Sequence, residues 1–249
     1  MDTKDHENIQ HYSCLSHVWA WSFACTIDRG CLFRGSSLRI RTGYERSRLW
    51  YLRRSVVRDG RNLLRYGKRA PRWCQRIWVD PQACASFVTS HGRSFTGQVL
   101  GGDWDRSRFP LTEHHKIGAC FAHWNDGIPW EATGIFDWFA DRLAGGASFD
   151  GCRTMEDVKL RYERLDIIFD QIKRDRRLRP IGEVEYDGFR EHGGVYIHVG
   201  HDNAPVFGNG GCHRLAMSVV LQLSAIPAQL GIVHEHSLPV WKQRFMRQT

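Results

Sequence analysis

The strongest constraint on the fold is a glycine-rich turn near the C-terminus that separates a strand pattern from a helix pattern. The stretch reads VFGNGGCHRLAMSVVLQLSAIPAQLGIV, residues 206–233. Ahead of it, GVYIHVGHD (194–202) alternates apolar and polar residues, which predicts a strand. Behind the turn a helical run precedes IPAQLGIVH, which predicts a closing strand after Pro227. Strand, turn, helix and strand in this order indicate an α/β or α+β fold.

Other segments carry periodic patterns of the same two kinds. We expect two aromatic-rich helices at residues 112–124 and 130–144 and one long helix from residue 154 onwards. Two short strands are expected at residues 76–82 and 181–188. Thr154 is placed to cap the long helix, with Asp157 at the capping-box position. The strand at 181–188 is expected to form a hairpin with 194–202.

These patterns divide the chain into three parts. Residues 1–75 form a basic, partly helical N-terminal extension, in which Gly60 is expected to break the helical pattern. Residues 76–153 hold a first strand and a helical insertion. Residues 154–249 form the main α/β domain.

The eight cysteines form no CxxC pair and no tight cluster with histidines. This distribution is typical of reduced thiols, and we therefore expect a cytoplasmic protein. The apolar patch at 14–25 is too short and too polar to span a bilayer.

Positive charge is concentrated in one segment. Arg39–Arg76 holds 13 Lys/Arg against 2 acids, whereas the rest of the chain holds 22 basic and 25 acidic residues. Interspersed aromatic residues, Trp50, Tyr51 and Tyr66, accompany these charges. The segment 39–76 therefore suggests an alternative function, non-catalytic binding of nucleic acid or another polyanion.

The turn itself has the chemistry of an anion site. A helix N-terminus exposes unpaired N–H groups and about half a positive charge. Glycines allow close approach of a phosphate, and an arginine adds a forked cationic donor. The residues expected to bind a nucleotide phosphate are Gly208, Gly210, Gly211, Cys212, His213 and Arg214. The same setting is expected to lower the pKa of the Cys212 thiol, making it a candidate nucleophile.

The order of elements from 157 to 233, with GGCHR at 210–214 and IPAQL after the helix, resembles the ParB/sulfiredoxin superfamily. The whole chain also looks like a group of ParB-like proteins without an established activity. The resemblance implies ATP or another nucleotide as ligand, with Mg²⁺, and a possible phosphoryl-transfer enzyme. For Cys212 it implies a second alternative, sulfiredoxin-type reduction of a cysteine sulfinic acid. The Arg-Pro-Leu-Pro-like stretch that gives sulfiredoxins another phosphate-binding arginine is not found.

Some polar residues outside the turn are further candidates. Free-serine kinases of the superfamily carry an acidic residue at the position of Gly210. In this chain, Asp202 or Glu185 is the candidate for the catalytic role of that acidic residue. The HEH run at 234–236 lacks an evident third ligand, so no metal site is expected. GGDWD at 101–105 is either a carboxylate pair or an ordinary turn.

Overall fold

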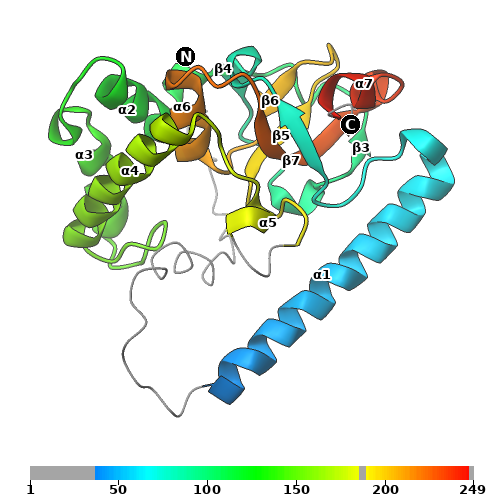
Figure 1. Ribbon diagram of the computed structural model, residues 1–249, viewed down its shortest axis with the longest axis horizontal. Coiled ribbons are helices and arrows are strands. Elements are labelled where there is room, and N and C mark those ends of the chain that lie inside the picture. The colour runs from blue at the N-terminus through cyan, green and yellow to red at the C-terminus, as the bar shows by residue number, and fades with distance from the viewer. Residues whose placement is uncertain (1–36, 185–188, 247–249) are drawn as a thin grey trace, which may run out of the picture.

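The computed structural model describes residues 37–184 and 189–246, with side chains from Leu49 onward. It is a mixed α/β structure built around one seven-stranded sheet (Figure 1). The helices are α1 Ser37–Tyr66, α2 His115–Trp124, α3 Ile135–Leu143, α4 Met155–Asp175, α5 Ile181–Val184, α6 Cys212–Val220 and α7 Trp241–Phe245. The strands are β1 Arg76–Val79, β2 Ser86–Phe87, β3 Val99–Leu100, β4 Phe109–Pro110, β5 Val195–Val199, β6 Pro205–Phe207 and β7 Ile226–His234.

The sheet has the order β1-β7-β5-β6-β2-β4, and β3 pairs with the end of β7. The central pair β5 and β7 is parallel, whereas β1 and β6 pair antiparallel with β7 and β5. Every residue of β5 and β7 is buried. Strands from residues 76–110 and from 195–234 therefore share one sheet, so the expected strand at 76–82 completes the sheet of the C-terminal part.

The two faces of β5 have different characters. Val195, Ile197 and Val199 belong to the main apolar core, which also includes Leu215 and Met217 of α6. Tyr196 and His198 alternate with them and point to the opposite face. The strand predicted from the alternation of apolar and polar residues at 194–202 is confirmed. The more polar residues of that pattern, Tyr196 and His198, are buried and do not face solvent.

Helices α2, α3 and α4 lie together beside α6, on the left of Figure 1. Their aromatic side chains pack around Tyr162, which is fully buried. Asp166 of α4 accepts hydrogen bonds from the indole N–H groups of Trp124 and Trp130, at 2.8 and 2.9 Å. The aromatic-rich helices expected at 112–124 and 130–144 are confirmed, with α2 and α3 beginning a few residues later.

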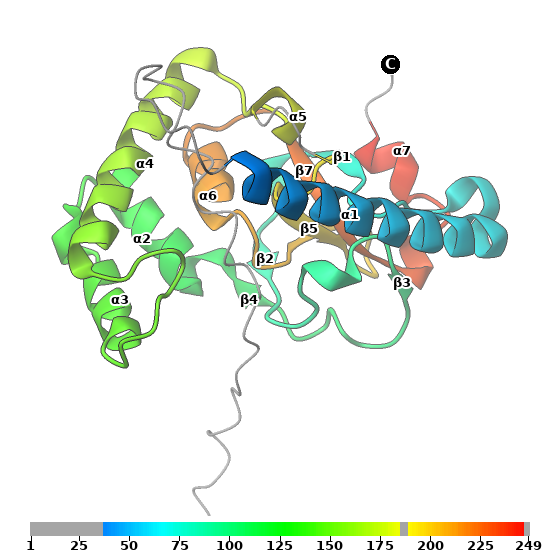
Figure 2. The same ribbon diagram turned by 90° about the horizontal axis from the view of Figure 1, so that it is seen from below.

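Helix α1 crosses the outside of the molecule as a single long rod (Figure 2). It runs through Gly60, so the expected break there is wrong. Two hydrogen bonds of one polar side chain tie its C-terminal half to the body. Asn62 donates from Nδ2 to the carbonyl oxygens of Pro71 and Gly97, at 2.7 and 2.6 Å. In the described part of the chain, no helix is long and apolar enough to cross a membrane.

Two further expectations have opposite outcomes. The capping box is confirmed, because Thr154 Oγ1 accepts from the Asp157 N–H at 3.1 Å and Asp157 accepts from the Thr154 N–H at 3.0 Å. The strand at 181–188 is wrong, since Ile181–Val184 is a short helix and 185–188 lie outside the described residues. The buried Glu191 carboxylate accepts from the Ile181 N–H at 3.0 Å and holds this helix start. The hairpin partner of β5 is instead β6.

We expect Asn62→Ala to destabilise the protein by about 2 kcal/mol, because two buried hydrogen bonds are lost and two carbonyl groups lose their donor. Urea unfolding monitored by circular dichroism measures this change. The control Asn125→Ala, at an exposed position, is expected to cost less than about 0.5 kcal/mol. Equal effects of the two substitutions would show that α1 is not anchored through Asn62.

Candidate functional site

The glycine turn between β6 and α6 is held tightly against β5. Gly211 has a φ of 80°, and a Cβ there would lie 2.9 Å from Val195 Cα. The Tyr196 N–H donates to the Gly210 carbonyl at 2.8 Å, and the Gly208 N–H donates to the Tyr196 carbonyl at 2.8 Å. Glycine is required at 211 both for the left-handed conformation and for this close approach.

Two guanidinium groups meet beside the turn. Arg214 Nη2 donates to the carbonyl oxygen of Gly193. Arg93 Nη2 donates to the carbonyl oxygen of Gly194 at 2.8 Å and lies 3.4 Å from that of Gly193. A Cβ on Gly210 would lie only 2.5 Å from Arg93 Nη2. The absence of a side chain at 210 is therefore what allows Arg93 to lie against the turn.

Arg93 was not identified from the sequence. It comes from the short segment Arg93–Phe95, well beyond β1. Its only sequence signal is the turn-like SHGRS at 90–94. The spacing of this turn from Gly210 in the sequence does not reveal that the two are close in space, because it is the pairing of distant strands in the sheet that brings them together.

The side chain of His213 does not face the turn. It is buried, and its Nε2 lies 3.4 Å from the hydroxyl oxygen of Tyr162. Burial lowers the pKa of His213 to about 3, helped by the charges of Arg161 and Lys116. The ring is therefore neutral at physiological pH, and the expected role of its side chain in phosphate binding is corrected. Only its backbone N–H remains available to that role.

The Cys212 thiol also differs from expectation. The residue is half-buried at the first position of α6. Burial raises the pKa of the thiol and outweighs the charges of Lys116 and Arg161, which lower it. The expected lowering by the helix dipole is therefore wrong in direction. None of the five cysteines in the described residues forms a disulfide.

A charged group lies on the Cys212 side of the helix start. Asp150 accepts from Lys116 Nζ at 2.8 Å and forms an ion pair with Arg161 at 3.1 Å. Burial raises the pKa of Asp150, but Lys116 and Arg161 outweigh burial and hold it below its usual value. With two cations and one ionised carboxylate, this group adds positive charge near the N-terminus of α6.

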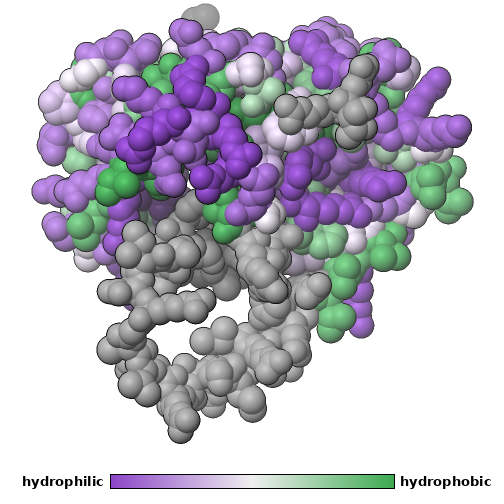
Figure 3. Space-filling view, viewed as in Figure 1, coloured by the Kyte–Doolittle hydropathy of each residue, from purple (hydrophilic) through white to green (hydrophobic). Residues whose placement is uncertain are grey.

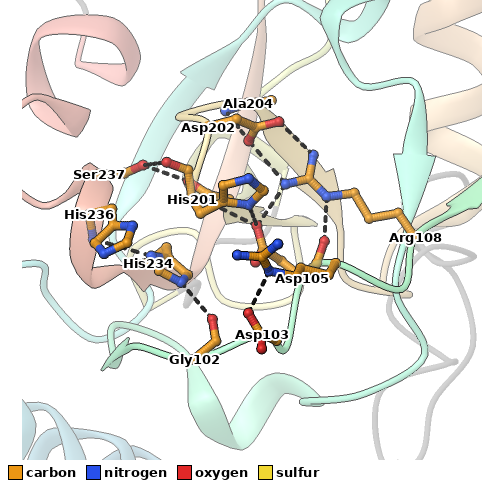
Figure 4. Close-up of polar contacts among 12 residues, drawn as sticks. Gly102, Asp103, Asp105, Arg108, His201, Asp202, Ala204, His234, His236 and Ser237 are labelled. Carbon is orange, nitrogen blue, oxygen red and sulfur yellow. Dashed lines mark hydrogen bonds and ion pairs between the residues drawn. The ribbon is translucent and has the colours of Figure 1, made fainter.

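Asp202 lies at the other end of the β5–β6 hairpin from the glycine turn. Both of its carboxylate oxygens accept from Arg108, each at 3.0 Å (Figure 4). The structure thus separates Asp202 from the turn, and its expected catalytic role there is corrected. Glu185 lies outside the described residues.

The GGDWD and HEH segments meet at the C-terminal ends of β5 and β7. The Trp104 ring stacks on His234 with ring centroids 6.1 Å apart. His234 Nε2 lies 2.9 Å from the Gly102 carbonyl oxygen (Figure 4). His198 Nδ1 accepts from the Ile232 N–H at 2.9 Å, at a bulge in the β5–β7 pairing. The neutral His198 ring therefore carries its proton on Nε2.

The only cluster of potential metal ligands found among the described residues is Asp105, His201 and Asp202, whose ligand atoms lie within 4.8 Å of one another. Arg108 already supplies a cation between the two carboxylates, donating to Asp105 Oδ2 at 2.7 Å. Burial raises the pKa of Asp105, but hydrogen bonds from His201 and Arg108 outweigh burial and lower it. The arrangement is that of an ion-pair network joining 105–108 to the hairpin tip.

Comparisons with protein-family models, curated proteins and solved structures find no match for this chain. The functional assignment therefore rests on the chemistry of the described residues. Among the predicted site residues, the structure brings together Gly208, Gly210, Gly211, Cys212 and Arg214, and it adds Arg93. These groups form the candidate anion site.

We expect the Cys212 thiol to react slowly. Because its raised pKa reduces the thiolate fraction, alkylation by iodoacetamide at pH 7.5 should be several-fold slower than that of glutathione. Peptide mass spectrometry after timed quenching measures the rate at this residue. The same peptide in urea serves as control and should react at the glutathione rate. Faster alkylation in the native protein would restore the reactive-thiol hypothesis.

Buried neutral histidines should make stability depend on pH. Burial lowers the pKa of His198 and His213 to about 3 and that of His192 to about 4. In the unfolded chain these groups titrate near 6.5, so the unfolded state binds more protons between pH 4 and 6.5. The free energy of unfolding should therefore fall as pH falls through this range, by about 1.4 kcal/mol per pH unit for each histidine.

Urea unfolding at a series of pH values between 4.5 and 7.5 measures this slope. His213→Gln should lower the slope by the contribution of one histidine, about 1.4 kcal/mol per pH unit. Asn125→Ala, at an exposed position without a titrating group, should leave the slope unchanged. A free energy of unfolding that is constant across this range would contradict the assignment of neutral buried rings.

Proposed function

We propose that the protein binds phosphate, free or as part of a nucleotide, at the turn Gly208–Arg214. The observation that carries the proposal is the meeting of Arg93 and Arg214 at the carbonyl groups of Gly193 and Gly194. A phosphate oxygen is a stronger partner for a guanidinium group than a neutral carbonyl oxygen, because both partners are charged. An arriving phosphate can therefore compete for donors that now bond the main chain.

The start of α6 supports the same conclusion. The helix has nine residues, and its first N–H groups carry the partial positive charge of the helix N-terminus. The group formed by Lys116, Asp150 and Arg161 contributes further net positive charge on the far side of Cys212. Anions are bound favourably where these two effects coincide.

Each residue of the turn then has a defined part. Gly210 lets Arg93 approach the main chain, and Gly211 lets the turn lie against β5. The two arginines then donate to phosphate oxygens. Cys212 and His213 contribute backbone N–H groups only. The resemblance of GGCHR to the ParB/sulfiredoxin superfamily supports a nucleotide, ATP with Mg²⁺ in the first instance, as the source of the phosphate.

The proposal is for binding, and no residue is assigned a catalytic role. Phosphoryl transfer uses a carboxylate as base or as a Mg²⁺ ligand. Asp202 lies at the far end of the hairpin, and Asp150 is held by Lys116 and Arg161. Sulfiredoxin-type chemistry needs a thiolate, which the raised pKa of Cys212 disfavours. The site thus fits recognition of an anion better than either reaction.

Isothermal titration with Mg·ATP, with CTP and inorganic phosphate as comparators, tests the proposal. Arg93→Ala and Arg214→Ala should each weaken binding by about 1.5–3 kcal/mol, the range for a charged hydrogen bond. Cys212→Ser should leave the affinity unchanged, because only its backbone contributes.

Two substitutions sharpen this test. Gly210→Ala should weaken binding as Arg93→Ala does, because its Cβ displaces the Arg93 guanidinium from the turn. Arg174→Ala, at an exposed position on α4, is the matched control and should have no effect. Thermal melts of each variant separate loss of binding from loss of fold. If the wild type binds none of the three ligands, the turn serves only as the entry to a helix.

A further inference from the structure

Helix α1 carries arginines on one side and Asp59, the only acidic residue among its described side chains, on another. Asp59 Oδ1 accepts from the Trp73 N–H at 2.7 Å, and Asp59 Oδ2 forms an ion pair with Arg190 at 2.7 Å. This carboxylate therefore anchors α1 to the body of the protein. Among the described side chains, its ion pair is with Arg190 and not with the arginines on the outer side of the helix.

Those arginines surround a pocket of about 360 Å³. This volume falls within the range of about 300–1,000 Å³ that is usual for ligand sites. The pocket is lined by Trp50, Arg53, Arg54, Val57, Arg58, Arg61 and Trp73, which we call the α1 groove. None of its four arginines forms an ion pair with any residue whose side chain is described.

Among the described residues that line the α1 groove, none carries a negative charge. The Gln98 amide, with its oxygen turned toward Arg58, accepts from both terminal nitrogens at 2.9 and 3.1 Å, but it is neutral. Burial lowers the pKa of Arg58, and the neighbouring charge of Arg54 lowers it further. Four cations that repel one another on a single helix are stabilised by an anion shared between them.

The α1 groove also contains an exposed aromatic ring, the indole of Trp50. The Trp50 side chain is 49% exposed, whereas Trp73 is buried. The Arg54 guanidinium carbon lies 4.7 Å above the Trp50 ring, and the Trp73 ring meets Trp50 edge-on at 6.3 Å. A half-exposed aromatic ring held in place beside several arginines is the pairing that single-stranded nucleic acid uses, with bases on the ring and phosphates on the arginines.

We propose that the α1 groove binds single-stranded nucleic acid, with Arg53, Arg54, Arg58 and Arg61 on phosphates and Trp50 stacking on a base. A single strand is favoured over a duplex because its bases are free to stack on a side chain. This site is separate from the glycine turn, and each stands without the other.

The competing partner is an anionic membrane surface. Leu49, Leu52, Val56 and Leu63 are all more than two-fifths exposed, and their spacing places them on one stripe of α1. Apolar side chains are visible along α1 at the lower right of Figure 3. The arginines, however, line a hollow with the two tryptophans instead of flanking this stripe on a plane. A concave cationic site matches a flexible chain better than a flat surface.

Fluorescence anisotropy of the full-length protein with labelled 20-nucleotide oligo(dT) and oligo(U) tests the proposal. The double variant Arg54→Glu/Arg61→Glu should weaken binding at least tenfold. Loss of two phosphate contacts should also reduce the slope of log affinity against log salt by about 1.4. Trp50→Ala should weaken binding by about 5- to 150-fold, the equivalent of one stacked base.

The matched control is Arg164→Glu/Arg174→Glu, which changes the net charge equally at exposed positions on α4. It should leave affinity nearly unchanged, as should Arg93→Ala at the glycine turn. Equal losses for the two double variants would overturn the proposal, because they would show attraction by net charge alone. Wild type that binds anionic phosphatidylglycerol vesicles but neither oligonucleotide would also overturn it, in favour of the aliphatic stripe.

Discussion

The close approach of Gly211 to Val195 is the contact on which the rest of the site depends. Because no Cβ separates the two main chains, the turn after β6 returns directly onto β5 and α6 starts beside it. The same approach brings Arg214 to the carbonyl of Gly193, where Arg93 arrives from a distant part of the chain. A larger residue at 211 would be strained by its φ of 80° and would also separate the turn from the strand.

Burial then decides the chemistry of the turn. A helix N-terminus and nearby cations favour the charged form of a thiol, yet Cys212 and His213 are turned toward α2 and α4, where desolvation dominates. The thiol is kept protonated and the imidazole neutral. The positive charge that remains is that of arginine, whose guanidinium stays ionised even when half-buried. These charges favour the proposed binding of an anion over the activation of a nucleophile.

Local signals predicted the elements that local forces determine. The capping box at Thr154 and the turn at Gly211 are fixed by neighbouring residues, and both were predicted from the sequence. The pairing of β1 with β7, the helix at Ile181–Val184 and the position of Arg93 depend on contacts between distant segments. His213 was misread for the same reason, since nothing in GGCHR shows that Tyr162 of α4 lies behind it. The position of the glycine turn could thus be predicted from the sequence, but the side chains that surround it could not.

The buried Tyr196 is affected by one arginine from each of the two proposed sites. Arg93 lies 5.5 Å from the Tyr196 ring, and both Arg93 and Arg58 lower the pKa of its hydroxyl, which burial raises above its usual value. The Tyr196 hydroxyl is therefore near positive charge from both the turn and the α1 groove. Because the buried phenol is uncharged, it neutralises neither set of arginines. The proposals for the turn and for the α1 groove therefore rest on different residues and are tested by separate substitutions.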